Sequence, residues 1–287
     1  TGLLMWKGHL LRRLIAKYSK NEGAPAYITY TEFVSADGLV RAGQEGRAKL
    51  MRDLVYTPAE RPIVAQFFTA TPAHMEAAAK LAQELGFDGV DINMGCPDRT
   101  IEKQGAGAKL ITTPALAVEL IAAAKRGAPG LPVSVKTRLG YNKDALEEWL
   151  PALLAAEPAA IVLHARTRKE MSKVAAHWDR VKRAVEIRNE LGSKTLILGN
   201  GDLKNVEDAK EKIKESGADG AMLGRAVFGN PWLFSGKTFQ HSAECENVVA
   251  QLQTAIEHTK LFEELLGDIK SFAIMKKHFK AYVEGFA

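Results

Sequence analysis

Short runs of β-branched and other apolar residues alternate with longer amphipathic segments along most of the chain. The apolar runs predict strands at residues 27–31, 63–67, 89–93, 133–137, 160–164, 195–200 and 220–223. The segments between them predict helices at residues 12–19, 74–85, 114–126, 145–155, 178–191 and 206–215. Four helices run into a glycine that is expected to end them in a left-handed conformation, namely Gly86, Gly127, Gly192 and Gly217.

The strand candidates are apolar almost throughout, as in VSVK, AIVLH and TLILGN. Such runs are typical of parallel strands that are buried on both faces of a sheet. Seven strands are clear, and an eighth would have to occupy residues 2–6. The pattern therefore predicts an α/β fold, a TIM (β/α)8 barrel with an atypical or incomplete first strand. An open Rossmann sheet would carry a G-x-G-x-x-G turn after a strand, and the sequence has none.

The character of the chain changes after the segment PWLF at residues 231–234. No strand candidate follows, and residues 244–284 predict two or three helices. We therefore expect a barrel domain over residues 1–238 and a small helical domain over residues 239–287. Whether the helical domain is truncated is left open by the sequence.

Composition narrows the class of protein only a little. The 287 residues are 46% hydrophobic and 25% charged, which is ordinary for a globular protein with a sizeable core. Two cysteines, Cys96 and Cys245, make no disulfide framework, so we expect a reducing, cytoplasmic setting. No apolar run is long enough to predict a membrane span or a signal peptide. The net charge of +5 permits a polyanionic partner without requiring one.

Polar residues stand at the carboxyl ends of the seven predicted strands, where TIM barrels place their reacting groups. They are Glu32, Gln66, Asn93, Cys96, Lys136, Arg138, His164, Arg166, Asn200, Asp202, Gly224 and Arg225. Each of them alone is explained by an ordinary hydrogen bond at a strand end, whereas the set predicts one site. The turns GNGD and GRA after the last two strands predict a phosphate site, because backbone N–H groups bind phosphate there in many barrels.

Several motifs occur in an order that resembles a known family. They are NMGCP, GAGAKL, SVKTRLG, LHARTR, GNGD and GADGAMLGRAVFGNPWLF, and the resemblance runs from about Tyr30 to the end of the chain. On these motifs the chain resembles the tRNA-dihydrouridine synthases. The resemblance implies an FMN-binding barrel, a helical tRNA-binding domain and reduction of the C5=C6 bond of a uridine in tRNA. It also implies NADPH as the reductant of FMN.

The resemblance implies that Cys96, in the GCP motif, is the acid that protonates C5. A free thiol has a pKa of about 8.5, so it is mostly protonated at neutral pH and can donate a proton. The bland alternative is a buried, inert cysteine, which is the commoner fate of a free cysteine. Cys245 has no comparable context and is expected to be structural.

Other roles follow from the resemblance residue by residue. The cofactor-binding set is Gln66, Lys136, His164, Asn200, Gly201, Asp202, Gly224 and Arg225. The substrate and tRNA set is Asn93, Arg138, Arg166, Arg168, Lys276 and Lys277. Lys136 would lie near N1–C2 of the flavin, where the reduced ring is negative. No metal and no membrane partner are implied, and we expect a monomer.

The amino-terminal segment departs from the family pattern. The family has Ala-Pro-Met at the end of its first strand, packed on the flavin, and residues 1–9 lack it. Two alternatives to the synthase therefore stay open. One is an FMN-dependent barrel that reduces a small molecule, and the other is an RNA-binding barrel that has lost flavin.

Overall fold

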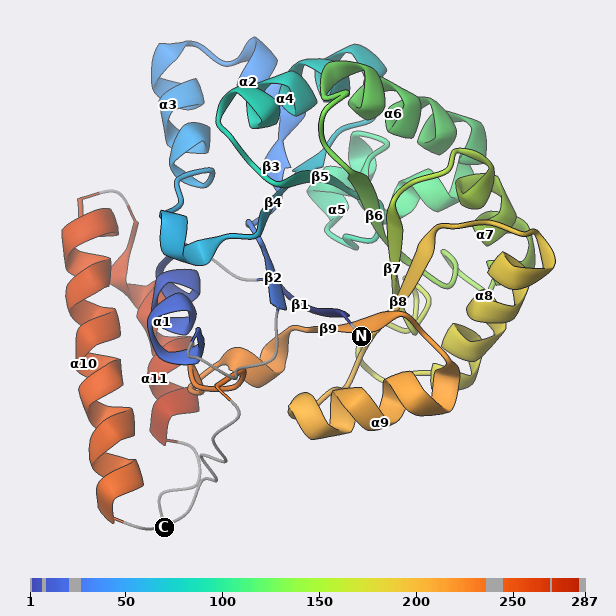
Figure 1. Cartoon of the computed structure of the whole chain (residues 1–287). Helices are drawn as coiled ribbons and strands as arrows, with labels where there is room; N and C mark the ends of the chain where they lie inside the picture. Colours follow the sequence, from blue (N-terminus) through green and yellow to red (C-terminus); the bar gives the residue numbers. More distant parts are fainter. Residues whose placement is uncertain (1, 7–8, 21–26, 236–244, 269, 284–287) are drawn as a thin grey trace.

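The apolar runs form parallel strands, and eight of them close into a barrel in the computed structural model (Figure 1). The structure describes residues 2–6, 9–20, 27–235, 245–268 and 270–283. The barrel strands are β1 (Gly2–Trp6), β2 (Tyr27–Tyr30), β4 (Ile63–Phe68), β5 (Gly89–Asn93), β6 (Val133–Arg138), β7 (Ala160–His164), β8 (Leu196–Asn200) and β9 (Gly220–Leu223). A two-residue strand, β3 (Val34–Ser35), pairs with the end of β4 beside the ring.

The first strand is present where the sequence predicted it. Strand β1 is hydrogen-bonded in parallel to β9 on one side and to β2 on the other. Strand β2 in turn pairs with β4 through Thr29 and Tyr30, which closes the ring. Closure leaves no open sheet edge between the first and last strands, which confirms the predicted TIM-type barrel.

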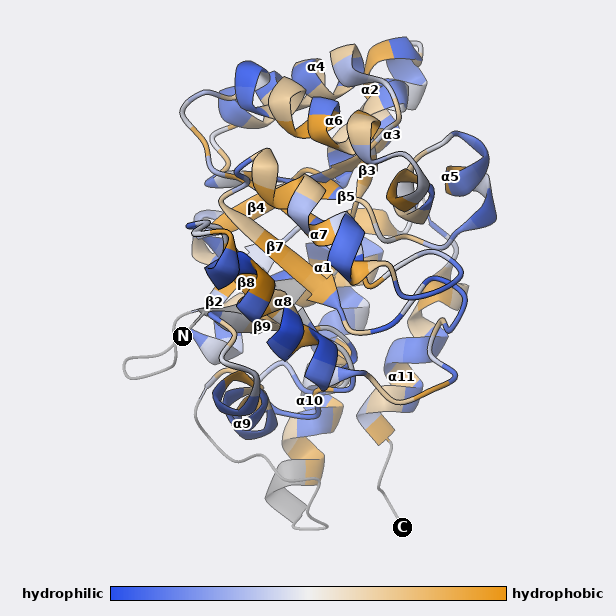
Figure 2. Ribbon diagram, turned by 90° about the vertical axis from the view of Figure 1, so that its right-hand side faces the viewer, coloured by the Kyte–Doolittle hydropathy of each residue, from blue (hydrophilic) through white to orange (hydrophobic). Residues whose placement is uncertain are grey.

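Helices cover the outside of the barrel and return the chain from the end of one strand to the start of the next. They are α1 (His9–Ser19), α2 (Ala36–Arg41), α3 (Gln44–Arg52), α4 (Pro72–Glu84), α6 (Pro114–Gly127), α7 (Leu146–Ala155), α8 (Trp178–Glu190) and α9 (Val206–Ser216). Shorter turns are α5 (Arg99–Lys103), η1 (Pro58–Glu60), η2 (Gly107–Thr112) and η3 (Arg225–Val227). Figure 2 shows apolar strands inside and polar faces on the outer helices, as expected for strands buried on both sides.

Three of the four glycines predicted to end helices adopt the left-handed conformation. The φ angles of Gly86, Gly192 and Gly217 are 76°, 62° and 70°. The prediction was wrong for Gly127, which closes α6 without a positive φ. A Cβ atom there would lie 2.1 Å from the Glu76 carbonyl oxygen, so this glycine allows α4 and α6 to pack closely.

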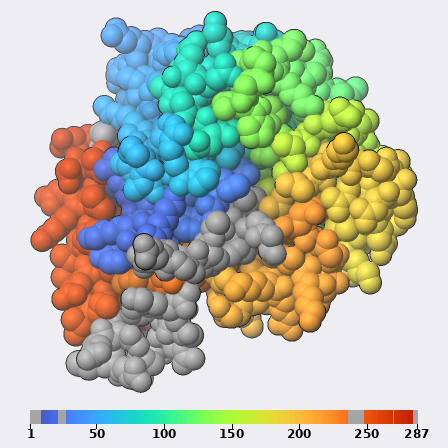
Figure 3. Space-filling view, viewed as in Figure 1, coloured from blue at the N-terminus to red at the C-terminus, as the bar shows by residue number. Residues whose placement is uncertain are grey.

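The carboxyl-terminal helices flank the barrel beside α1 (Figures 1 and 3). They are α10 (Cys245–Leu266), η4 (Phe272–Met275) and α11 (Lys276–Val283). Leu10 of α1 packs with Phe262 and Met275 in a small apolar cluster. Lys17 and Tyr18 of α1 bond the Glu257 carboxylate of α10 at 2.8 and 2.6 Å. Among the described residues, no helix combines the length and the apolar character that crossing a bilayer requires.

A buried ion pair ties α1 to the turn that precedes β4. The Arg12 Nε atom donates to the Glu60 carboxylate at 2.8 Å, and both side chains are fully buried. Arg12 also donates to the Val55 carbonyl at 3.0 Å, while Glu60 accepts from the Thr57 backbone N–H at 2.8 Å. Because both charges are out of water, loss of either partner leaves an uncompensated charge in the interior.

We expect Glu60→Gln to lower the free energy of unfolding by about 3–5 kcal/mol, because the Arg12 charge stays buried without its carboxylate. Urea denaturation of the purified variants measures this. Glu45→Gln is the matched control, since Glu45 pairs with Lys49 at an exposed i, i+4 position and its loss should leave the free energy of unfolding nearly unchanged. Equal losses in the two variants would contradict the assigned importance of the buried pair.

Candidate active site

The strand register places polar residues of neighbouring strands side by side at the carboxyl end of the barrel. The paired positions are Gln66 with Asp91, Asn93 with Lys136, Arg138 with His164, His164 with Asn200, and Asn200 with Met222. Side chains two residues apart on a strand point to the same face. Lys136 and Arg138 of β6 therefore both point into the barrel mouth, as do Asp91 and Asn93 of β5.

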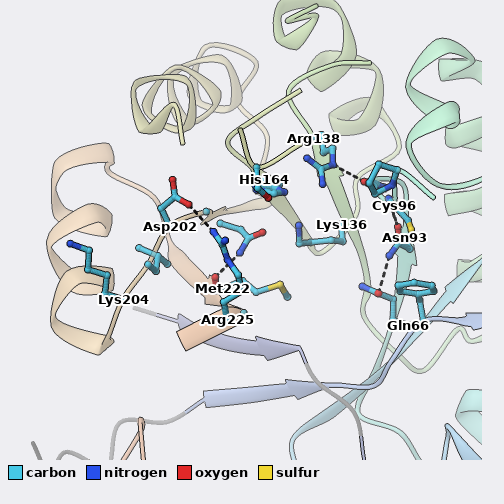
Figure 4. Close-up of a pocket in the computed structure, with 18 residues that line it drawn as sticks. Gln66, Asn93, Cys96, Lys136, Arg138, His164, Asp202, Lys204, Met222 and Arg225 are labelled. Carbon is cyan, nitrogen blue, oxygen red and sulfur yellow. Dashed lines mark hydrogen bonds and ion pairs between the residues drawn. The ribbon is translucent and has the colours of Figure 1, made fainter. Parts of the chain in front are cut away.

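These side chains surround a cavity of about 480 Å3 (Figure 4). The predicted site residues that line it are Gln66, Asn93, Cys96, Lys136, Arg138, His164, Asn200, Gly201, Asp202, Gly224 and Arg225. A cavity of this volume is in the range that holds small ligands and cofactors. Within the described segments, no three His, Cys, Asp or Glu side chains gather as they would around a metal ion.

Cys96 lies in a loop that is anchored at several backbone atoms. Its own N–H and that of Gly95 donate to the Asn93 Oδ1 atom at 2.9 and 3.1 Å. Arg138 Nε donates to the Gly95 carbonyl at 2.7 Å. The Cys96 carbonyl accepts from the Ala108 N–H at 2.9 Å. This carbonyl lies 2.7 Å from where a Cβ of residue 107 would be, so only glycine fits at Gly107. The loop therefore holds the thiol at the cavity wall.

Burial raises the pKa of the Cys96 thiol above its usual value. The nearby Arg138 acts in the opposite direction, and it does not outweigh burial. The thiol is consequently protonated at neutral pH, which suits a proton donor better than a nucleophile.

Lys136 and His164 both line the cavity. Burial, together with repulsion by Arg138, lowers the pKa of Lys136 to about 7. In the described part of the chain, the Lys136 ammonium group makes no hydrogen bond. Burial, followed by the charges of Lys136, Arg138, Arg166 and Arg225, lowers the pKa of His164 to about 2. His164 is therefore a neutral imidazole over the whole physiological range.

The turns after β8 and β9 form the opposite end of the cavity. Gly201 and Asp202 both have positive φ angles, 133° and 55°. The Asp202 carboxylate accepts from Arg225 at 2.9 Å and also from Arg166. Trp178 Nε1 donates to the Gly201 carbonyl at 3.0 Å, which holds the turn in place.

Two arginines predicted to face RNA have other partners. Arg166 is only 2% exposed, and its guanidinium group bonds Asp202 and the Val174 carbonyl. These contacts favour a role in which Arg166 holds Asp202 in place, rather than the RNA contact that the sequence predicted. Arg168 is partly exposed and pairs with Glu102 of α5 while lying 5.1 Å from the Tyr141 ring centre.

Lys276 and Lys277 lie outside the cavity, at the exposed start of α11. Lys277 borders a second, smaller cavity together with Glu32 and Phe228. Because Glu32 and Phe228 follow the carboxyl ends of β2 and β9, α11 flanks the barrel mouth on the side of these strands.

Sequence reasoning missed several residues of the cavity. They are Phe33, Ser172, Leu203, Lys204 and Met222. It also missed Asp91, a fully buried carboxyl group beneath the cavity. A polar residue inside the apolar run GVDIN was the available signal for Asp91. Met222 had none, because a methionine in a strand is ordinary core.

The fold and the cavity define a TIM barrel with a ligand-binding mouth. The family model described as Dihydrouridine synthase (Dus) matches residues 5–287, and the chain belongs to this family. It is 35% identical over 274 residues to a "Probable tRNA-dihydrouridine synthase" of Staphylococcus aureus (strain MRSA252), covering 95% of this chain and 81% of that protein. It is also 35% identical to "Probable tRNA-dihydrouridine synthase 2" of Bacillus subtilis (strain 168), covering 95% and 82%.

Solved structures share the fold at low sequence identity. An old yellow enzyme homologue from Zymomonas mobilis matches with a TM-score of 0.51 and 13% identity, covering 80% of this chain and 86% of that one. Histamine dehydrogenase from Rhizobium sp. 4-9 matches with a TM-score of 0.57 and 10% identity, covering 80% and 44%. At this identity the likeness concerns the barrel alone.

We expect Lys136→Met to stabilise the protein freed of ligands at neutral pH. The pKa of Lys136 falls from 10.5 to about 7 on folding, so the unfolded chain binds more protons between these values. The free energy of unfolding of the unsubstituted protein should therefore rise with pH across this window, and that of the variant should lack this rise. Urea denaturation at pH 7 and pH 9 measures both effects. Lys210→Met, on the exposed face of α9, is the control and should leave the slope unchanged.

Proposed function

We propose that this chain is a tRNA-dihydrouridine synthase, an oxidoreductase that adds two hydrogen atoms across the C5=C6 bond of a uridine in tRNA. One observation carries the proposal: a protonated thiol, Cys96, and a lysine side chain, Lys136, line the same cavity in a barrel of the Dus family. The printed names of the relatives give it further support.

The residues of the cavity fit FMN. The Lys136 side chain, which is half-buried at the cavity, has no hydrogen-bond partner among the described residues, and a negatively charged ring would supply one. Gln66 and His164 would bind the same ring. Asn200, Gly201, Asp202, Gly224 and Arg225 would hold the phosphate end, where Asp202 is already neutralised by two arginines. FMN, once reduced by NADPH, would supply a hydride to C6 of the uracil.

Cys96 would supply the proton to C5. Burial keeps its thiol protonated, and the anchored loop keeps it at the cavity wall. The sulfur left as a thiolate regains a proton from solvent. Hydride and proton together account for the two hydrogen atoms that the uracil gains.

Asn93 and Arg138 would bind the uracil, since both line the cavity beside Cys96. The target base must leave its stack to enter the barrel mouth. Arg168 at the rim, with Lys276 and Lys277 on α11, would bind the phosphates of the tRNA around it. Their contribution is electrostatic and should weaken as salt rises.

The function is tested with purified protein, FMN, NADPH and tRNA that lacks dihydrouridine. We expect flavin absorption bands that NADPH bleaches, and a gain of two hydrogen atoms per modified uridine by nucleoside mass spectrometry. A bleached flavin without modified tRNA would favour the small-molecule reductase. Binding of tRNA without any uptake of FMN would favour the RNA-binding barrel.

We expect Cys96→Ala to retain FMN binding and tRNA binding while losing dihydrouridine formation by about 100- to 10,000-fold, the usual range for removal of a general acid. Initial rates with saturating NADPH, together with the flavin spectrum, separate the chemical step from binding. Turnover of the variant at the unsubstituted rate would exclude Cys96 as the acid.

Cys245→Ala is the control for removal of a thiol, because Cys245 is the other cysteine of the chain. It should turn over tRNA as the unsubstituted protein does. A loss in this variant comparable to that of Cys96→Ala would point to a general effect of thiol removal.

A further inference from the structure

Asp91 is a fully buried carboxyl group in the middle of β5, directly beneath the cavity. Its Oδ1 atom accepts from the Ser134 hydroxyl at 2.6 Å, and its Oδ2 atom accepts from Gln66 Nε2 at 2.7 Å. Burying a carboxyl group is costly, and an apolar residue of similar size would satisfy the barrel core equally well. This cost points to a functional role for the Asp91 carboxyl group.

The hydrogen bonds above Asp91 all run in one direction. The N–H groups of Gly95 and Cys96 donate to Asn93 Oδ1. Asn93 Nδ2 donates to Gln66 Oε1 at 3.1 Å, and Gln66 Nε2 donates to Asp91. Figure 4 shows the central bond of this chain between Asn93 and Gln66.

The direction is determined at both ends. A carboxylate only accepts hydrogen bonds, so Gln66 must turn its NH2 group toward Asp91. Backbone N–H groups only donate, so Asn93 must turn its oxygen toward the Cys96 loop. An amide side chain can be flipped at little steric cost, and the carboxylate removes that freedom from Gln66. The Gln66 oxygen is then held toward Asn93, where it supports the orientation that the backbone N–H groups give to Asn93.

We propose that Asp91 is a positioning residue, which sets the orientation of the Gln66 amide and, through the hydrogen bond from Asn93 to Gln66, supports Asn93 in anchoring the loop that carries Cys96. Asn93 Oδ1 already accepts two hydrogen bonds, so this amide offers a ligand only its remaining N–H. It thus suits a ring carbonyl better than a ring amine. The statement about the ligand rests on the proposed function, whereas the anchoring of Cys96 does not.

The test is the rate at which iodoacetamide alkylates Cys96 in protein freed of FMN and tRNA, followed by peptide mass spectrometry. Asp91→Leu removes the acceptor, so the Gln66 amide can flip, withdraw its oxygen from Asn93 and loosen the loop that Asn93 anchors. We expect alkylation of Cys96 to become about tenfold faster, the factor that corresponds to loss of one hydrogen bond. Alkylation of Cys245 in the same sample is the reference and should keep its rate.

Ser134→Ala is the matched control. It removes the other hydrogen bond to Asp91 and leaves the bond to Gln66, so the rate for Cys96 should change less than about twofold. An unchanged rate in folded Asp91→Leu protein, or an equal rise in both variants, would overturn the proposal.

Gln66→Leu gives a second, independent route to the same result. It should speed the alkylation of Cys96 as much as Asp91→Leu does. The double variant should react no faster than either single variant, because both substitutions break the same chain of hydrogen bonds. Additive effects would overturn the proposal. If Asp91→Leu does not fold, Gln66→Leu alone tests the proposal, and an unchanged alkylation rate for Cys96 in that variant would overturn it.

Turnover distinguishes this proposal from the proposed function. In an active enzyme, Asp91→Leu should lower kcat through misplacement of Cys96 and leave the KM for tRNA within about twofold, because phosphate contacts dominate RNA affinity. A tenfold response of alkylation in a protein that forms no dihydrouridine would leave Asp91 as a positioning residue and refute the synthase.

Discussion

The register of the eight parallel strands is the constraint on which the rest of the structure depends. Strands β4 to β9 each contribute one or two side chains to the mouth, and a shift by one residue would turn them outward. His164 shows how tightly this is coupled, because its strand neighbours are Arg138 on one side and Asn200 on the other. The ring can impose this arrangement because β1 bridges β9 and β2 and leaves no strand free to slip.

The mouth concentrates positive charge, and two of the groups that carry it, Arg138 and Arg166, are buried. Lys136, Arg138, Arg166 and Arg225 all act on His164, and Asp202 compensates only the last two arginines. Such crowding opposes folding, so it is a feature that function retains against stability. A ligand with negative charge would relieve it, which makes an anionic cofactor or a polyanionic substrate the natural occupant.

The sequence predicted the barrel and the residues at its strand ends because both depend on local pattern: apolar runs and the residue that follows each run. It could not predict interactions that exist only after closure. In the sequence Arg166 is part of a basic loop, but its partner in the structure is Asp202, which follows the end of β8. Gly127 reads as a helix stop, yet it serves the packing of α6 on α4. Asp91 stands in an apolar run, and only its contacts with Ser134 and Gln66 explain it.

Helix α1 contacts both the barrel and the carboxyl-terminal helices. Its inner face is tied to the barrel through Arg12 and Glu60, and its outer end is tied to α10 through Lys17, Tyr18 and Glu257. The carboxyl-terminal helices therefore cannot be exchanged between relatives as a separate module. A chimera that transplants them must carry the complementary surface of α1 as well, although that surface lies more than two hundred residues earlier in the chain.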